Sequence, residues 1–237
     1  MNNILKMAAT TVSKPKITLY VDTVSPFAYE AFHLLRHDPT FAPCEIEYVP
    51  IFLGGLMHKC GNTAPIKVKN KDIWINKERL RWAQHFSIPM LSPGLPPDFP
   101  APTLPVMRAL CAIQALNDGK GSKLTKALEV FFRKHWVEGV ATHRPEILKE
   151  TLKEIFGGEE EAENILTAAS STAKASLLAN TDRAFAEGAF GLPWMTCTNS
   201  KGEKEGFWGV DHLGQVVQFL GLESGLKGGN KGWKAML

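Results

Sequence analysis

Ser25 and Pro26 stand where an alternating apolar segment gives way to a helical pattern. Serine is a favoured N-cap and proline is favoured at the first helical position, so this pair predicts a helix start. A helix start at the carboxyl end of a parallel strand is also where open α/β sheets bind anions. No base and no G-x-S-x-G elbow accompany Ser25, so its hydroxyl is a poor nucleophile but a good hydrogen-bond donor. Such a donor can hold a thiolate that a small-molecule cofactor brings, and lower the pKa of that thiol.

A second stretch that could contribute to binding is GAFGLPWM, residues 188–195. Gly188 and Gly191 flank a tight turn into the following segment, and Pro193 precedes or opens a strand, where proline is tolerated. One interpretation is an ordinary turn into a hairpin. The other is a cis Leu192–Pro193 bond, which would leave the main-chain amide and carbonyl of Leu192 free to pair with an extended, peptide-like ligand.

The elements that must position these residues begin with a strand–helix–strand unit. Residues 16–22 alternate between apolar and polar side chains, residues 27–36 are apolar at helical spacing, and residues 45–51 alternate again. A helix of that length can cross over between two strands, so the unit predicts a parallel pair.

The remainder of the chain separates into a helical block and a short return to strands. The helical patterns cover residues 77–86, 105–117, 123–138, 145–156, 159–170 and 173–187. Strand patterns follow at 195–198 and 206–209, around a turn-rich segment, and Asp211 is predicted to cap a last helix at 212–220.

The order βαβ, helices, ββα predicts an α/β fold: a thioredoxin-like domain with a large all-helical insertion. The expected boundaries are 15–53 and 188–222 for the discontinuous thioredoxin-like domain, 54–187 for the inserted helical domain, and 1–14 and 223–237 for flexible termini.

Composition excludes several classes of protein. The 27 basic and 24 acidic residues are interspersed, so neither a nucleic-acid groove nor a polybasic membrane anchor is indicated. The four cysteines form no C-x-x-C pair and no zinc-like spacing, which favours reduced thiols and no metal. No apolar run approaches the roughly 18 residues that span a bilayer. We expect an intracellular protein of the cytoplasm or the mitochondrion, because residues 1–16 fit either a disordered arm or a presequence, but not a secretory signal.

Five motifs together resemble a known family. They are Ser-Pro-Phe after a strand, GGLM followed by CGNTAP, HFSIP after a helix, GAFGLP, and FWGVDHL near the end. In this order and spacing, over residues 16–222, they are similar to the kappa-class glutathione transferases and the 2-hydroxychromene-2-carboxylate isomerases. That family has a thioredoxin-like domain interrupted by a helical domain, and it is related to the DsbA-type disulfide oxidoreductases.

The resemblance implies a site for glutathione and a role for each matching residue. Ser25, followed by Pro26 and Phe27, would donate to the glutathione sulfur, and Leu192 beside cis Pro193 would pair with the cysteinyl main chain. The other implied contacts are Asn62 and Lys71 for the glycyl end, and Val210 and Asp211 for the γ-glutamyl end. The family also implies a homodimer and a second substrate that is an apolar, electrophilic small molecule.

The chain departs from the family pattern in ways that affect substrate preference. Phe27 and Ala28 replace a frequent tyrosine and a polar residue, and His212 replaces the usual arginine. Four functions therefore stay open at this point. They are a glutathione transferase, a glutathione-dependent isomerase, a disulfide oxidoreductase, which lacks its thiols at Ser25 and Ala28, and a non-catalytic binder of thiol peptides.

Overall fold

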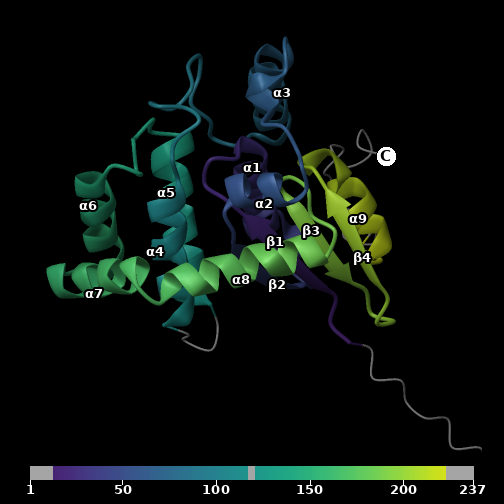
Figure 1. Cartoon of the computed structure of the whole chain (residues 1–237). Coiled ribbons are helices and arrows are strands. Elements are labelled where there is room, and N and C mark those ends of the chain that lie inside the picture. Colours follow the sequence, from purple (N-terminus) through teal and green to yellow (C-terminus); the bar gives the residue numbers. More distant parts are fainter. Residues whose placement is uncertain (1–12, 117–120, 223–237) are drawn as a thin grey trace, which may run out of the picture.

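The computed structural model describes residues 13–116 and 121–222 of the chain (Figure 1). The strands are β1 (Lys16–Val21), β2 (Glu45–Pro50), β3 (Trp194–Thr198) and β4 (Lys204–Trp208). The helices are α1 (Pro26–His37), α2 (Leu53–Lys59), α3 (Lys71–Phe86), α4 (Leu104–Ala115), α5 (Ser122–Trp136), α6 (Pro145–Phe156), α7 (Glu159–Ser170), α8 (Ala173–Ala186) and α9 (Leu213–Phe219). Short 3₁₀ turns are η1 (Pro39–Phe41), η2 (Pro65–Lys67) and η3 (Val210–His212).

The described strands form one mixed sheet in the order β2-β1-β3-β4. β1 and β2 are parallel, as predicted, and β3 pairs antiparallel with both β1 and β4. This arrangement confirms the predicted thioredoxin-like α/β class. The C-terminal end of β1 and the N-terminal end of β3 lie side by side, because Tyr20 lies opposite Trp194. We call this end of the central strands the sheet edge.

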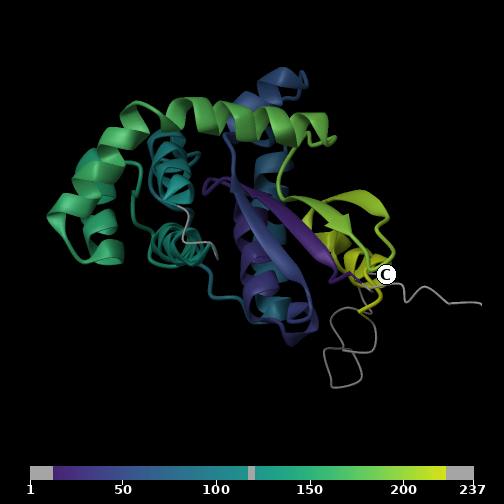
Figure 2. The same cartoon turned by 90° about the horizontal axis from the view of Figure 1, so that it is seen from below.

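Helices cover both faces of the sheet (Figure 2). On one face, Tyr20 donates a hydrogen bond of 2.8 Å to Glu187, just after α8, and Arg183 of α8 lies 2.9 Å from Glu47 of β2. On the other face lie α1 and α9, where Phe32 packs on Tyr48 and Phe219 packs on Phe207.

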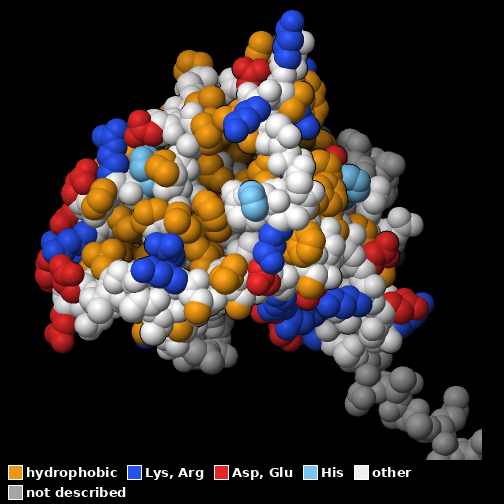
Figure 3. Space-filling model, in the orientation of Figure 1, with side chains coloured by type: hydrophobic (Ala, Val, Ile, Leu, Met, Phe, Trp, Pro, Cys, Tyr) orange, Lys and Arg blue, Asp and Glu red, His pale blue; other side chains and the backbone are white. Residues whose placement is uncertain are grey.

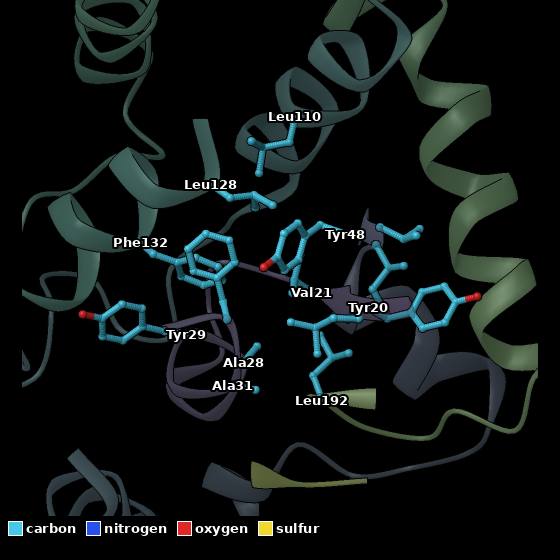
Figure 4. Close-up of a cluster of buried hydrophobic side chains, with 14 of the residues drawn as sticks. Tyr20, Val21, Ala28, Tyr29, Ala31, Tyr48, Leu110, Leu128, Phe132 and Leu192 are labelled. Atoms are coloured by element: carbon cyan, nitrogen blue, oxygen red, sulfur yellow. The ribbon is translucent and has the colours of Figure 1, made fainter. Parts of the chain in front are cut away.

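One apolar core continues from the sheet into the helical insertion (Figure 4). Tyr29 and Phe32 of α1 contact the ring of Phe132 of α5, with centroids 5.6 and 5.3 Å apart. Figure 4 shows Tyr48 of the sheet and Leu110 of α4 converging on the same cluster. The insertion is therefore packed against the first βαβ unit through buried aromatic side chains.

Some element boundaries differ from those predicted. α3 begins at Lys71 rather than 77. Its N-cap residue, Asn70, has a left-handed φ of 70° and makes no side-chain capping bond, so no capping motif marks this start in the sequence. α2 was not predicted at all. Its two glycines disfavour a helix locally, but the ring of Phe52 packs over them, and a Cβ at Gly54 would lie 2.9 Å from that ring.

The predicted cap of the last helix is also wrong. Asp211 lies inside η3 and makes no capping hydrogen bond, while His212 is the N-cap residue of α9. The chain turns here at Gly209, whose φ of 94° favours glycine, and where a Cβ would overlap the Asp211 carboxylate. The two-domain boundaries remain a prediction, and most of the predicted flexible termini, residues 1–12 and 223–237, lie outside the described residues.

Candidate functional site

Ser25 lies at the start of α1, as predicted. It is the N-cap residue, its Oγ accepts a hydrogen bond of 3.2 Å from the N–H of Ala28, and its side chain is buried. No acceptor for the Ser25 hydroxyl hydrogen lies among the described residues. The hydroxyl therefore caps the helix and still has a hydrogen to donate to a ligand.

The turn before Ser25 is held by a buried carboxylate that the sequence analysis did not single out. Asp22 has no exposed surface and accepts hydrogen bonds from Val24 N at 3.1 Å, Leu53 N at 2.9 Å and Thr103 Oγ1 at 2.8 Å. The carbonyl of Asp22 also accepts from Ser25 N at 3.1 Å. Burial raises the pKa of the Asp22 carboxyl, and these side-chain hydrogen bonds oppose the rise. The sequence signal for this buried anchor was the acidic residue directly after an apolar strand.

The predicted cis bond between Leu192 and Pro193 is present in the loop that leads into β3. Pro193 O accepts a hydrogen bond of 3.0 Å from Gly209 N, so the loop is tied to the segment that precedes η3. Among the described residues, the main-chain N–H and C=O of Leu192 have no hydrogen-bond partner. They are free to pair with an extended ligand, in the manner of an added strand.

Val210 and Asp211 lie at the same edge of the sheet, in η3, which packs against α1. The side chain of Val210 is buried, whereas that of Asp211 is exposed with its Oδ1 3.5 Å from His212 Nδ1. An acid and the N-terminal amides of a helical turn are thus available together beside the start of α1.

Asn62 reaches the loop that carries the cis bond, and Lys71 does not. Asn62 Nδ2 donates a hydrogen bond of 2.8 Å to Phe190 O, and its Oδ1 accepts from Thr63 N. Lys71 is the first residue of α3, and its exposed side chain has no hydrogen bond or ion pair with a described residue. The structure therefore brings together the predicted residues at the sheet edge and leaves Lys71 separate.

Aromatic side chains border this edge of the sheet. The ring centroid of Phe190 lies 5.0 Å from that of Trp208 and 5.9 Å from that of Trp194. Phe190 and Trp208 are both exposed. Gly191 permits this packing, because a Cβ there would lie 2.8 Å from Trp208 Nε1. Figure 3 shows the surface hollowed below α3, with hydrophobic side chains on the rim of the hollow.

Two buried ionisable side chains lie near each other, Glu30 of α1 and Arg79 of α3. Arg79 is fully buried and donates hydrogen bonds to Leu91 O at 2.8 Å and to Gly94 O. Glu30 is also fully buried, and neither of its carboxylate oxygens has a hydrogen-bond partner. Burial raises the pKa of Glu30 well above its usual range, and the charge of Arg79 opposes the rise. Nothing in the amino-acid pattern pairs these two residues.

Two kinds of feature are not found in the part of the chain that the structure describes. No group of three or more His, Cys, Asp or Glu side chains is placed to hold a metal ion. None of the described helices has the length and apolar character needed to cross a membrane.

Comparison with known proteins places this geometry in context. The model of the DsbA-like thioredoxin domain matches residues 16–221. Glutathione S-transferase kappa 1 of Caenorhabditis elegans is 26% identical over 210 residues, covering 87% of this chain and 91% of the relative.

Among solved structures, a 2-hydroxychromene-2-carboxylate isomerase aligns with a TM-score of 0.70 at 21% identity, covering 88% of this chain and 96% of the isomerase. The cytosolic disulfide reductase DsbM from Pseudomonas aeruginosa, solved with glutathione, aligns with a TM-score of 0.56 at 20% identity, covering 90% and 99% of the two chains. These likenesses confirm the fold.

Proposed function

The chain belongs to the DsbA-like thioredoxin family, and from this premise we propose that it is a glutathione-dependent transferase. The observation that carries the proposal is the juxtaposition at the sheet edge. A buried serine with a free hydroxyl hydrogen caps α1, and the unpaired main chain of Leu192 lies beside a cis Pro193 at the same edge. The similarity to the kappa-class transferase of C. elegans supports glutathione as the thiol.

In the proposed reaction, the protein first stabilises the thiolate of glutathione. The hydroxyl of Ser25 donates a hydrogen bond to the sulfur, and the N-terminal end of α1 favours the negative charge, so the thiol loses its proton to solvent near neutral pH. The thiolate then attacks an electrophilic carbon, an S–C bond forms, and the leaving group departs with its electron pair.

The other predicted residues would hold the tripeptide in an extended form. Leu192 would pair its amide and carbonyl with the cysteinyl main chain. Val210 and Asp211 would receive the carboxylate and the amino group of the γ-glutamyl end. Asn62 and Lys71 would hold the glycyl carboxylate, Lys71 as a point charge.

The second substrate in this proposal is an apolar electrophile. The hollow below α3 and the exposed rings of Phe190 and Trp208 offer the apolar surface that such a substrate needs. Assembly as a homodimer is also part of the proposal and follows from the family resemblance alone.

A second candidate reaction is the isomerase version. It is favoured by the high structural similarity to 2-hydroxychromene-2-carboxylate isomerase. The thiolate would add reversibly to an unsaturated substrate, a bond would rotate, and the thiolate would leave again, so glutathione would be recovered. Ser25 would have the same role in both reactions.

Disulfide exchange by the protein's own thiols is less well supported. Ser25 and Ala28 stand where a redox pair would lie at the start of α1. Cys44 and Cys111 are buried, and burial raises the pKa of their thiols to about 11 and about 12. Neither is therefore a ready thiolate at neutral pH.

The test compares wild type with Ser25→Ala in a conjugation assay with glutathione and 1-chloro-2,4-dinitrobenzene. We expect kcat/KM to fall about ten- to a hundredfold, because a hydrogen bond to a charged group is lost. The pKa of bound glutathione, followed by thiolate absorbance, should rise toward that of the free thiol. Ser170→Ala, at an exposed position in α7, is the control.

Three outcomes contradict parts of the proposal. Measurable glutathione binding without conjugation in wild type would remove the transferase and leave the isomerase and the non-catalytic binder. Product formation from a cis-trans substrate without net use of glutathione would select the isomerase. An unimpaired Ser25→Ala would remove the role assigned to the serine.

A further inference from the structure

A cavity of about 180 Å³ lies between α2, α4 and α8. Its apolar lining comes from Phe52, Leu104, Leu177 and Leu178. None of its lining residues is among those proposed to hold glutathione. The exposed fraction of Leu178 is 59%, so this leucine presents apolar surface at the rim of the cavity.

Three cations surround this apolar lining. Lys59 Nζ is neutralised by Asp182, whose Oδ1 lies 2.7 Å away. Arg108 and Lys174 have no ion-pair partner among the described residues, and Arg108 Nε is buried without any hydrogen-bond partner. A buried guanidinium donor without a partner is costly, so a ligand acceptor at this point is favoured.

From these observations we propose that the cavity binds a small monocarboxylate with an apolar chain. The carboxylate would accept hydrogen bonds from Arg108, whose planar group suits a carboxylate, while Lys174 would add charge at the rim. The chain would lie on Phe52, Leu104 and Leu177, and would cover Leu178. The cavity volume of about 180 Å³ limits the length of the apolar chain that can fit.

The surface around the cavity has the same mixed character. Figure 3 shows hydrophobic side chains gathered where α4, α5 and the first turns of α8 meet, with Lys or Arg side chains among them. An amphiphilic anion matches both components, whereas an inorganic anion would leave the apolar lining exposed to water.

The cavity is mechanically connected to the thiol site. The main-chain N–H of Phe52 donates a hydrogen bond of 3.1 Å to Thr181 Oγ1 of α8. The N–H of the next residue, Leu53, donates a hydrogen bond to the Asp22 carboxylate. Thr103, which precedes Leu104 of the cavity, donates to the same carboxylate. The cavity wall and the turn before Ser25 therefore share one buried anchor, although the binding proposal does not depend on glutathione chemistry.

The experiment is isothermal titration calorimetry of the full-length protein with octanoate, with 1-octanol and acetate as comparison ligands. We expect one octanoate site, with much weaker binding of the alcohol and of the short acid. Arg108→Gln should weaken octanoate binding about ten- to a hundredfold, because a charge-assisted hydrogen bond is lost. Lys174→Gln, at an exposed position, should weaken it about two- to fivefold.

Controls separate binding from folding. Lys201→Gln, in the turn between β3 and β4, should leave the Kd for octanoate unchanged, and circular dichroism should show that each variant is folded. If Arg108→Gln does not fold, Leu178→Glu, at an exposed position, serves instead and should abolish octanoate binding. Equal binding of octanoate and 1-octanol, no octanoate binding at all, or wild-type affinity in Lys174→Gln and Leu178→Glu would overturn the proposal.

Discussion

The starts of α1 and α3 differ in how firmly the rest of the molecule holds them. The turn before α1 is attached to three distant segments: Asp22 binds Leu53 and Thr103, and Thr23 O accepts a hydrogen bond of 2.9 Å from Trp136 Nε1. α3, in contrast, begins with exposed residues, and Trp74 in its first turn is 53% exposed.

This difference assigns separate tasks to the two regions in the proposed reaction. A hydrogen bond that stabilises a thiolate must have fixed geometry, and Ser25 lies on the firmly held turn. A lysine that attracts a terminal carboxylate can act as a flexible point charge, and Lys71 lies on the exposed helix start. Arg79 connects the two, because it is the fully buried charged residue of α3 and lies near Glu30 of α1.

The largest expected effect is on the anchor of the α1 turn. Asp22→Ala leaves the donors of Leu53, Thr103 and Val24 without their acceptor, so the free energy of unfolding should fall by about 4 to 6 kcal/mol. Urea denaturation measures the loss. Asp72→Ala, at the exposed start of α3, is the matched control and should change stability by at most about 0.5 kcal/mol. Equal losses in the two variants would end the comparison.

A second effect concerns the buried carboxyl group of Glu30, which lies near Arg79 of α3. Burial raises the folded-state pKa of Glu30. The contribution of Glu30 to folding stability is therefore greatest below its ordinary pKa near 4.5 and is lost as the pH rises toward the raised value. Glu30→Gln has no such proton to lose. We therefore expect wild type to lose stability relative to Glu30→Gln between pH 5 and pH 8, measured by urea denaturation at each pH. A constant difference across this range would show that Glu30 stays ionised in the folded protein.

A smaller effect is expected where the exposed region touches the cis-proline loop. Asn62→Ala removes the hydrogen bond to Phe190 O, so stability should fall by about 1 kcal/mol and KM for glutathione should rise more than kcat falls. Asn164→Ala, exposed on α7, controls for loss of an asparagine. A fall in kcat alone would place Asn62 with the thiol end of the ligand instead.

The smallest structural effect is expected at Lys71. Because its side chain is exposed and has no described partner, Lys71→Gln should change stability by less than about 0.5 kcal/mol. KM for glutathione should nevertheless rise about two- to fivefold, and this rise should shrink at high salt. Lys77→Gln on the same helix should leave KM unchanged. A KM equal to wild type in Lys71→Gln would remove Lys71 from the proposed site.

Local patterns in the sequence determined much of the fold and placed Ser25 at a helix start. The Ser25-Pro26 pair marks the start of α1, alternation marks β1 and β2, and α7 spans the predicted residues 159–170. These features depend on neighbours within one helical turn or one strand, so their signals are present in a short window of sequence.

Tertiary structure alone decided the features that depend on distant partners. Asp22 is an anchor because Leu53 and Thr103, 31 and 81 residues away in sequence, bring their donors to it. α2 forms despite its glycines because Phe52 packs over them. The proximity of Glu30 to Arg79, and the position of Arg108 beside α8, likewise exist only once the helices pack. Burial and long-range hydrogen bonds are properties of the packed chain, and no short stretch of sequence contains them.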